Sequence, residues 1–91
     1  NMTRIIVKKL IWDEWNIAHI ARHHVEPEEV QEVCSGRNLF ERGRDGTYQI
    51  TGQTESGRYL NIVVVPRENG FYPVTARDAD KKERRRFKKK L

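Results

Sequence analysis

The sequence predicts a single small α+β domain, arranged as one strand, two helices, a three-stranded antiparallel sheet and a C-terminal helix. Its 91 residues, 36% of them hydrophobic, can bury one modest core and no second one. Apolar residues recur at helical spacing between residues 13 and 35, and at a spacing of two between residues 47 and 77. Asn1 precedes Met2, which we take as the natural start, so the predicted domain covers residues 2–91.

The first predicted strand covers residues 4–12, RIIVKKLIW, which are rich in β-branched side chains. Asp13 suits the N-cap of a helix, and Asn16 stands where a capping box has Glu or Gln. We expect two neighbouring stripes on this helix. One holds Ile17, Ile20, Ala21 and His24, and the other holds Trp15, His19, Arg22 and His23.

A second helix is predicted from Pro27, a residue favoured in the first helical turn, to a stop at Gly36. Val30, Val33 and Cys34 should face inward, and Glu28, Glu29 and Glu32 should face water. The chain has one cysteine, no secretory signal and no apolar run of membrane-spanning length. These features predict a protein of the reducing cytoplasm.

Three antiparallel strands should follow, over residues 47–53, 58–66 and 71–77. The first alternates apolar and polar residues, which indicates a sheet covered on one side, with a polar side that could face a ligand. The second is apolar on both faces and is therefore predicted to be central. Turns at residues 55–57 and at Asn69–Gly70 separate the strands.

The C-terminal segment, residues 78–91, has high helix propensity and ends in a basic tail. Asp78 or Asp80 can cap the helix, with Ala79, Glu83 and Phe87 on one side. Residues 81–91 carry a formal charge of +7 and residues 1–80 one of −2, so the positive field is local. It fits RNA, DNA, an anionic membrane or an acidic protein, and a basic tail can also serve only solubility.

All three histidines lie in the stretch HIARHH, at positions 19, 23 and 24. His19 and His23 are four residues apart and could share a metal ion, but no third ligand accompanies them. A packed or solvated face is the simpler interpretation, and acid–base chemistry is the third, because imidazole titrates near neutral pH.

Arg58 and Arg77 form a second candidate group. Neighbouring antiparallel strands could bring both to one end of the sheet, where two guanidinium groups can clamp a phosphate; ordinary surface arginines are the alternative. Glu83 is the one acid in the basic run. It can pair with neighbouring bases on its own helix, or turn toward the sheet as a partner of Arg77 or of a catalytic imidazole.

Three segments together resemble the BrnT-type toxins, which are ribonucleases of type II toxin–antitoxin systems. The segments are WDEWNIAHIARHHVEPEEV at 12–30, GRYLNIVVVPR at 57–67 and VTARDADKKERRRF at 74–87. The resemblance covers most of the chain and implies a RelE-like fold, metal-independent RNA cleavage in the cytoplasm, and neutralisation by a DNA-binding antitoxin. It implies no cofactor.

Position by position, Arg22 and His23 match the family's basic-His pair, Arg58 its strand arginine and Arg77 its Ala-Arg motif. Glu83 and Arg84 match its terminal-helix motif. His24 stands where glycine is usual, His19 where asparagine is common, and Thr75 where serine is frequent.

From the residues and the resemblance together we predict a metal-independent endoribonuclease toxin. Its substrate is RNA, and its protein partner is a cognate antitoxin, in a heteromeric complex that binds operator DNA. The predicted catalytic residues are His23, Arg58, Arg77 and Glu83, and the predicted RNA-binding residues are Arg22, Lys81, Lys82, Arg84 and Arg85. The alternatives are a non-catalytic binding module, or a degenerate toxin that only binds its antitoxin.

Overall fold

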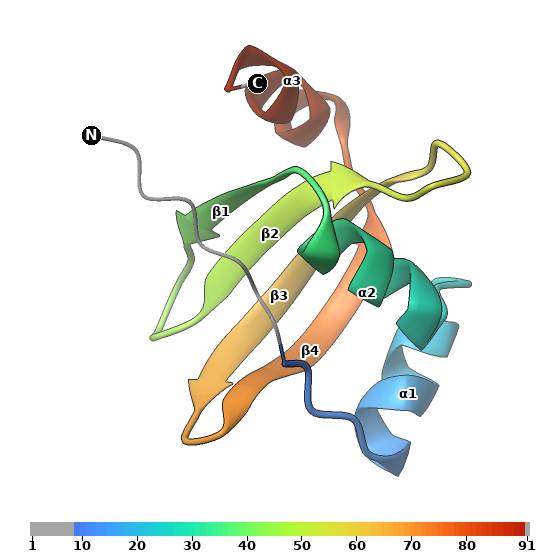
Figure 1. The fold of residues 1–91 in the computed structure, drawn as a ribbon, viewed down its shortest axis with the longest axis vertical. Helices are drawn as coiled ribbons and strands as arrows, with labels where there is room; N and C mark the ends of the chain where they lie inside the picture. The colour runs from blue at the N-terminus through green and yellow to red at the C-terminus, as the bar shows by residue number, and fades with distance from the viewer. Residues whose placement is uncertain (1–8, 91) are drawn as a thin grey trace.

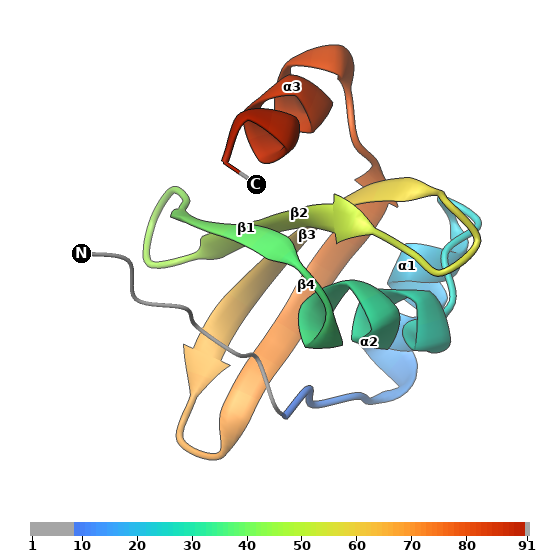
Figure 2. The same ribbon diagram turned by 45° about the horizontal axis from the view of Figure 1, so that its top comes forward.

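The computed structural model describes residues 9–90 as an antiparallel sheet with helices on both faces (Figures 1 and 2). The four strands neighbour one another in chain order, and each pairs antiparallel with the next. In chain order the elements are α1 (Glu14–Ala21), α2 (Pro27–Ser35), β1 (Asn38–Arg42), β2 (Tyr48–Gln53), β3 (Tyr59–Arg67), β4 (Gly70–Asp78) and α3 (Lys81–Lys89).

The predicted α+β class, the three strands and the three helices are confirmed, but the sheet has a further strand that we did not predict. Residues Asn38–Arg42, NLFER, show no clean alternation, and they become β1 by pairing with β2. The predicted strand over residues 4–12 lies largely outside the described residues. In its described part, Leu10 makes only a single parallel bridge to Phe71.

A closed capping box begins α1. The Asp13 carboxylate accepts a hydrogen bond from the Asn16 N–H, and the Asn16 side chain accepts one from the Asp13 N–H, both at 2.9 Å. Asn16 is fully buried, and its amide also donates to the carbonyl oxygens of Ile11 and Pro73. One side chain therefore caps α1 and fixes it against β4.

The predicted stripes of α1 are only partly correct. Ile20 is buried as expected, but Ile17 and Ala21 are exposed, because the helix ends at Ala21 and its inner face is narrow. His24 lies beyond the helix with φ 59°, so it does not extend an inner stripe. Its left-handed conformation closes the helix end, and this is the backbone geometry that glycine adopts most easily.

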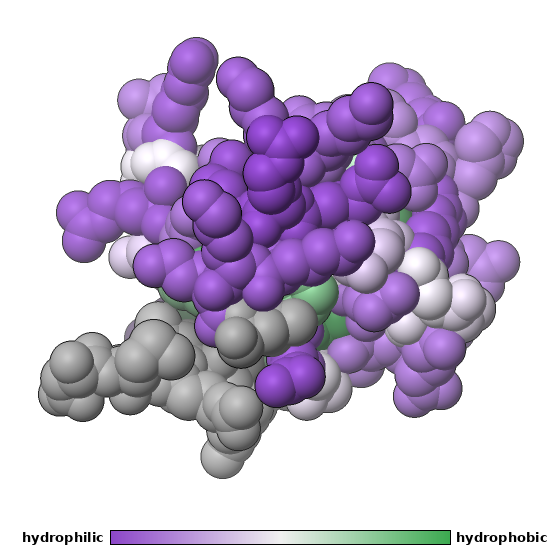
Figure 3. Space-filling model, turned by 90° about the horizontal axis from the view of Figure 1, so that it is seen from above, coloured by the Kyte–Doolittle hydropathy of each residue, from purple (hydrophilic) through white to green (hydrophobic). Residues whose placement is uncertain are grey.

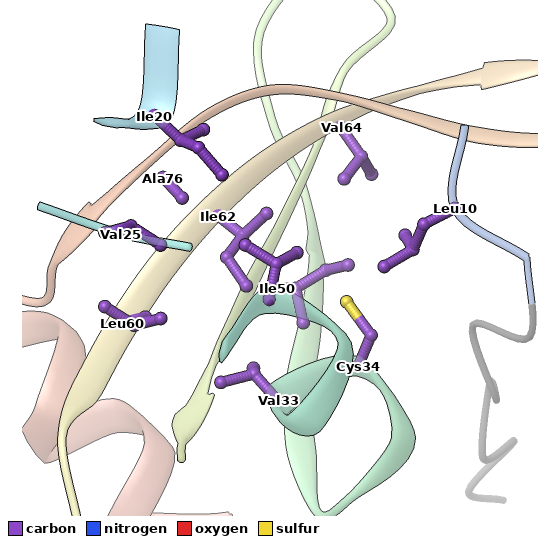
Figure 4. Close-up of a cluster of buried hydrophobic side chains, with 11 residues drawn as sticks. Leu10, Ile20, Val25, Val33, Cys34, Ile50, Leu60, Ile62, Val64 and Ala76 are labelled. Carbon is purple, nitrogen blue, oxygen red and sulfur yellow. The ribbon is translucent and has the colours of Figure 1, made fainter. Parts of the chain in front are cut away.

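The hydrophobic core lies between α1, α2 and one face of the sheet (Figure 4). Ile50, Ile62 and Ala76 face each other across β2, β3 and β4, and all are fully buried. Val30, Val33 and Cys34 of α2 pack onto them, as predicted. Gly52 permits this approach, since a Cβ atom there would lie 2.9 Å from Val33 Cγ1.

The opposite face of the sheet is covered in part by α3 (Figure 2). Phe87 is buried and its ring meets that of Tyr59 edge-on, at 6.1 Å between centroids. Asp80 is the N-cap, which settles the choice between Asp78 and Asp80. Beneath α3, the buried Asn61 amide donates to Gln49 and Thr51, so this side of the sheet is polar. No helix formed by residues 9–90 is both long and apolar enough to span a membrane.

Candidate functional site

Arg58 and Arg77 lie at the same end of the sheet, as predicted from antiparallel pairing. Arg58 immediately precedes β3, and Arg77 is the penultimate residue of β4, opposite Asn61. The α1–α2 connection, the β2–β3 turn and the end of β4 all reach this side of the molecule (Figure 1). The candidate site is therefore assembled from three separate segments of the chain, next to α3.

Arg58 binds protein groups with four of its five N–H bonds. Its Nε donates to Asp78 Oδ1 at 2.7 Å, and its Nη1 donates to the His24 carbonyl oxygen and to the Glu29 carboxylate. Its Nη2 donates to the His23 carbonyl oxygen at 3.0 Å. These contacts fix the α1–α2 connection to the sheet, and the hydrogen bond and charge of Arg58 lower the pKa of Asp78.

Arg77 forms a two-pronged ion pair with Glu83 of α3. Arg77 Nη1 lies 2.9 Å from Glu83 Oε1, and Nη2 lies 2.8 Å from Oε2. Glu83 also accepts the Asp80 N–H at 2.9 Å, so it closes the capping box of α3. The predicted alternative in which Glu83 turns toward Arg77 is the one observed, and this pairing lowers the pKa of Glu83 despite its burial.

The three histidines are held at the end of α1 and just after it. The His19 ring stacks on Trp15 at 4.8 Å between centroids, and the His23 ring meets His19 edge-on at 6.5 Å. His23 and His24 are exposed. Their main-chain carbonyl oxygens accept hydrogen bonds from Arg58, which places both residues beside the Arg58–Asp78 pair. Arg22 caps the helix and is also exposed.

Six of the seven basic residues of α3 fall into two groups, and Lys81 belongs to neither. Arg84 and Lys88 lie over the Tyr59 ring, at 5.8 and 5.4 Å from its centroid. Four others line a shallow hollow at the i, i+3, i+4, i+7 spacing of one helix face; we call Lys82, Arg85, Arg86 and Lys89 the basic stripe. Seen from the side on which α3 lies, the molecule is almost entirely hydrophilic (Figure 3).

The structure therefore sorts the predicted RNA-binding residues. Lys82 and Arg85 belong to the basic stripe, whereas Arg84 packs on Tyr59 and Lys81 is exposed in the first turn. Sequence reasoning missed Arg86 and Lys89, although projecting residues 81–89 on a helical wheel would have grouped them with Lys82. Arg86 also pairs with Glu41 of β1, at 3.2 Å.

Sequence reasoning also missed Asp78 and Glu29 as partners of Arg58. Each is separated from Arg58 by at least 20 residues, and neither belongs to a recognisable spacing motif. Only the antiparallel register could have suggested Asp78, because its neighbour in β3 is Leu60, two residues after Arg58.

Within residues 9–90, no three His, Cys, Asp or Glu side chains are grouped as metal ligands. No protein-family model matches the chain, and no curated protein is significantly similar to it.

Proposed function

We propose that this protein is a metal-independent endoribonuclease, the toxin component of a type II toxin–antitoxin system of the BrnT type. The three sequence segments that resemble these toxins support the proposal. Two of the arginines named from those segments lie at the same end of the sheet, Arg58 on the side of α2 and Arg77 on the side of α3, and the His23 main chain is bound to Arg58. The adjoining α3 carries the positive charge needed to hold an RNA backbone.

The observation that carries the proposal is that Arg77 is held in place by hydrogen bonds and still has N–H donors free of partners among the described residues. Glu83 and the Asp78 carbonyl oxygen occupy three of its five N–H bonds. Nε–H and one Nη2–H have no partner among residues 9–90, and 42% of the side chain is exposed. Arg77 is therefore a rigidly held guanidinium group that retains donors for a phosphate, at the base of a cationic helix.

In the proposed reaction, the ribose 2′-hydroxyl attacks the adjacent phosphorus, and the bond to the 5′-oxygen of the next nucleotide breaks. The products are a 2′,3′-cyclic phosphate and a 5′-hydroxyl. His23 transfers the proton, because imidazole is the most common acid–base group in enzymes and this one is exposed. Arg77 stabilises the charge that develops on the phosphorane oxygens.

The hydrogen-bond partners of Glu83 and Arg58 determine the roles that we propose for them. Glu83 is ionised at neutral pH, so it can accept a proton but has none to donate. Arg58 is tied to the carbonyl oxygens of His23 and His24, and it positions His23 while adding positive charge to the site. The basic stripe, with Arg22 and Lys81, holds the RNA backbone. The protein acts in the cytoplasm and is silenced by a DNA-binding antitoxin.

The test is cleavage of end-labelled RNA by the purified chain, with and without EDTA, beside His23→Ala and the matched control His19→Ala. We expect EDTA-resistant cleavage that His23→Ala lowers by about 10²-fold or more, the usual contribution of one acid–base group. His19→Ala should retain most of the activity. Equal activity of His23→Ala and wild type would remove His23 from the mechanism.

A non-catalytic nucleic-acid-binding module is the second candidate. The hydrogen bonds within the site favour this candidate, because they leave few groups to contact a substrate. Arg58 keeps one N–H without a partner among the described residues. Both carboxylate oxygens of Glu83 accept hydrogen bonds from Arg77 or Asp80. RNA binding without turnover, at any ratio of protein to RNA, would select this candidate.

A further inference from the structure

The outer face of α1 is apolar although it is exposed. The helix has the sequence EWNIAHIA, and only Asn16 and Ile20 are buried beneath it. Trp15 is 56% exposed and Ile17 42% exposed, and they are the large hydrophobic side chains most open to solvent among the described residues. Ala18 and Ala21 are exposed as well. Exposed apolar side chains grouped on one helix face are typical of interaction sites, and among residues 9–90 this face is left open to solvent.

The shape of this face suits another helix or an extended apolar segment. Successive residues are 100° apart around a helix, which places Ala18 and Ala21 between Ile17 on one flank and Trp15 on the other. The two small side chains therefore form a low strip between the two larger ones; we call this strip the channel and its two alanines the floor. A side-chain stripe of a partner can approach the α1 backbone closely along such a floor.

The charge around the channel is negative. Residues 13–36, which form the α1–α2 layer, carry six acidic residues and one arginine, a formal charge of −5. Glu14 lies on the channel itself, and Glu26 and Glu28 are exposed at the start of the neighbouring α2. The positive α3 covers the opposite face of the sheet (Figure 2). The α1 side of the molecule therefore attracts a cationic partner.

We propose that the outer face of α1 docks a basic amphipathic segment of a partner protein. The segment has an apolar stripe that fits between Trp15 and Ile17, and flanking Lys or Arg side chains that meet Glu14, Glu26 and Glu28. Aromatic anchors surrounded by polar residues are the usual centre of a protein interface.

A segment docked on the channel also affects the proposed catalytic site, because the channel lies close to His23. The Trp15 ring stacks on His19, and the His19 ring lies 6.5 Å from that of His23. A segment that packs against Trp15 therefore lies beside this chain of rings and obstructs access to His23. This consequence, silencing of the nuclease by its partner, rests on the proposed function; the docking itself does not.

The test uses the full chain and a synthetic helical peptide with a leucine stripe flanked by lysine and arginine. A peptide of the same composition, scrambled so that no stripe forms, is the control ligand. Binding is followed by ¹⁵N chemical-shift mapping and by fluorescence anisotropy of the labelled peptide. Two variants are compared: Ala18→Arg, which fills the channel floor, and Asn69→Arg, which adds the same charge at the exposed β3–β4 turn.

We expect the striped peptide to shift α1 resonances, and Ala18→Arg to weaken its binding by about tenfold or more, as for truncation or blocking of an interface centre. Asn69→Arg should change binding by less than about threefold, the effect of one remote charge in physiological salt. Equal binding of the scrambled peptide, or shifts confined to other elements, would overturn the proposal. So would concentration-dependent dimerisation abolished by Ala18→Arg, which would make a second copy of the chain the occupant. Since no RNA is present, docking can succeed even if no cleavage is ever found.

Discussion

His24 is one of two non-glycine residues in the described part of the chain that have a positive φ, the other being Asp45. Its φ of 59° lies in the left-handed region, where a Cβ atom crowds the following carbonyl oxygen. The conformation ends α1: the Val25 N–H reaches the Ile20 carbonyl oxygen, and the chain turns toward α2. The resemblance to BrnT-type toxins pointed to glycine at this position, and the geometry supplies a physical reason for that residue.

His24→Gly should therefore stabilise the protein, by about 0.5–1 kcal/mol in the free energy of unfolding, since the relieved backbone strain exceeds the added flexibility of the unfolded chain. Chemical denaturation of the two proteins measures the change. His19→Gly is the matched control, because it lies inside α1 and should cost about 1 kcal/mol. If His24→Gly is the less stable protein, the imidazole makes a stabilising contact that outweighs the strain.

Asn16 illustrates which contacts of a side chain can be predicted from sequence and which cannot. The capping-box position was predicted from spacing alone and is confirmed. Its burial and its bond to the Pro73 carbonyl oxygen join residues 57 positions apart, and no local pattern encodes such a contact. The same limit explains why Arg58 was predicted as a phosphate ligand while its partners, Glu29 and Asp78, were not foreseen.

At the scale of elements, α3 is held to the sheet by its contacts with the Tyr59 ring and by two ion pairs. Phe87 packs on Tyr59 in the middle, Glu83 binds Arg77 at the first turn, and Arg86 binds Glu41 near the end. The two ion pairs differ in burial: the Glu83 side chain is 9% exposed and that of Glu41 is 32% exposed. The Arg77–Glu83 pair should therefore contribute more to stability.

Glu83→Gln should lower the free energy of unfolding at pH 7 by about 1–2 kcal/mol, the range of a hydrogen-bonded charge that is partly screened by solvent. The folded-state pKa of Glu83 lies below the usual value of 4.5, so its contribution is complete above that value and disappears as pH falls through the folded pKa. The difference between wild type and variant should accordingly shrink below about pH 4.

Denaturation midpoints from pH 7 to pH 2 measure this difference, with Glu41→Gln as the control for the exposed pair. Glu41→Gln should cost less than about 0.5 kcal/mol at every pH. A difference that stays constant down to pH 2 would mean that Glu83 stabilises α3 through packing rather than through its charge.

Helices and strands with a regular spacing of apolar residues were predictable, whereas a strand that forms only through hydrogen bonds to its neighbour was not. The alternation in residues 47–53 and the apolar run in 58–66 predicted β2 and the central β3, and Pro27 and Gly36 predicted the limits of α2. Strand β1 has adjacent Leu39 and Phe40 and no alternation, so only its hydrogen bonds to β2 make it a strand. The end of α1 at Ala21 depends on the left-handed turn at His24, which sequence spacing does not predict.

On the scale of the whole molecule, charge is segregated by the sheet. The α1–α2 layer has a formal charge of −5 on one face, and residues 81–91 carry +7 on the other. The sequence predicted the basic C-terminal end, but it did not predict that the acidic and basic layers lie on opposite faces of the sheet. The face on which α3 lies is determined by its packing on Tyr59.

The salt dependence of RNA binding should report the basic stripe. Replacing Lys82, Arg85 and Lys89 together with glutamine should reduce the slope of log K against log salt by about 2, given roughly 0.7 per phosphate contact on a single strand. Replacing the exposed Arg37, Arg42 and Arg44 removes the same charge outside α3 and should leave the slope nearly unchanged. Equal slope changes in both triple variants would mean that binding responds to net charge and not to the stripe.

The separation of charge across the sheet also makes the molecule an electric dipole whose positive pole is α3. Near a polyanion such a body experiences a torque, and it rotates during the diffusional encounter until α3 leads. The association rate can then exceed that expected from net charge alone, because fewer collisions are spent in unproductive orientations. The positive pole engages first, so the encounter begins with α3 in contact with the polyanion.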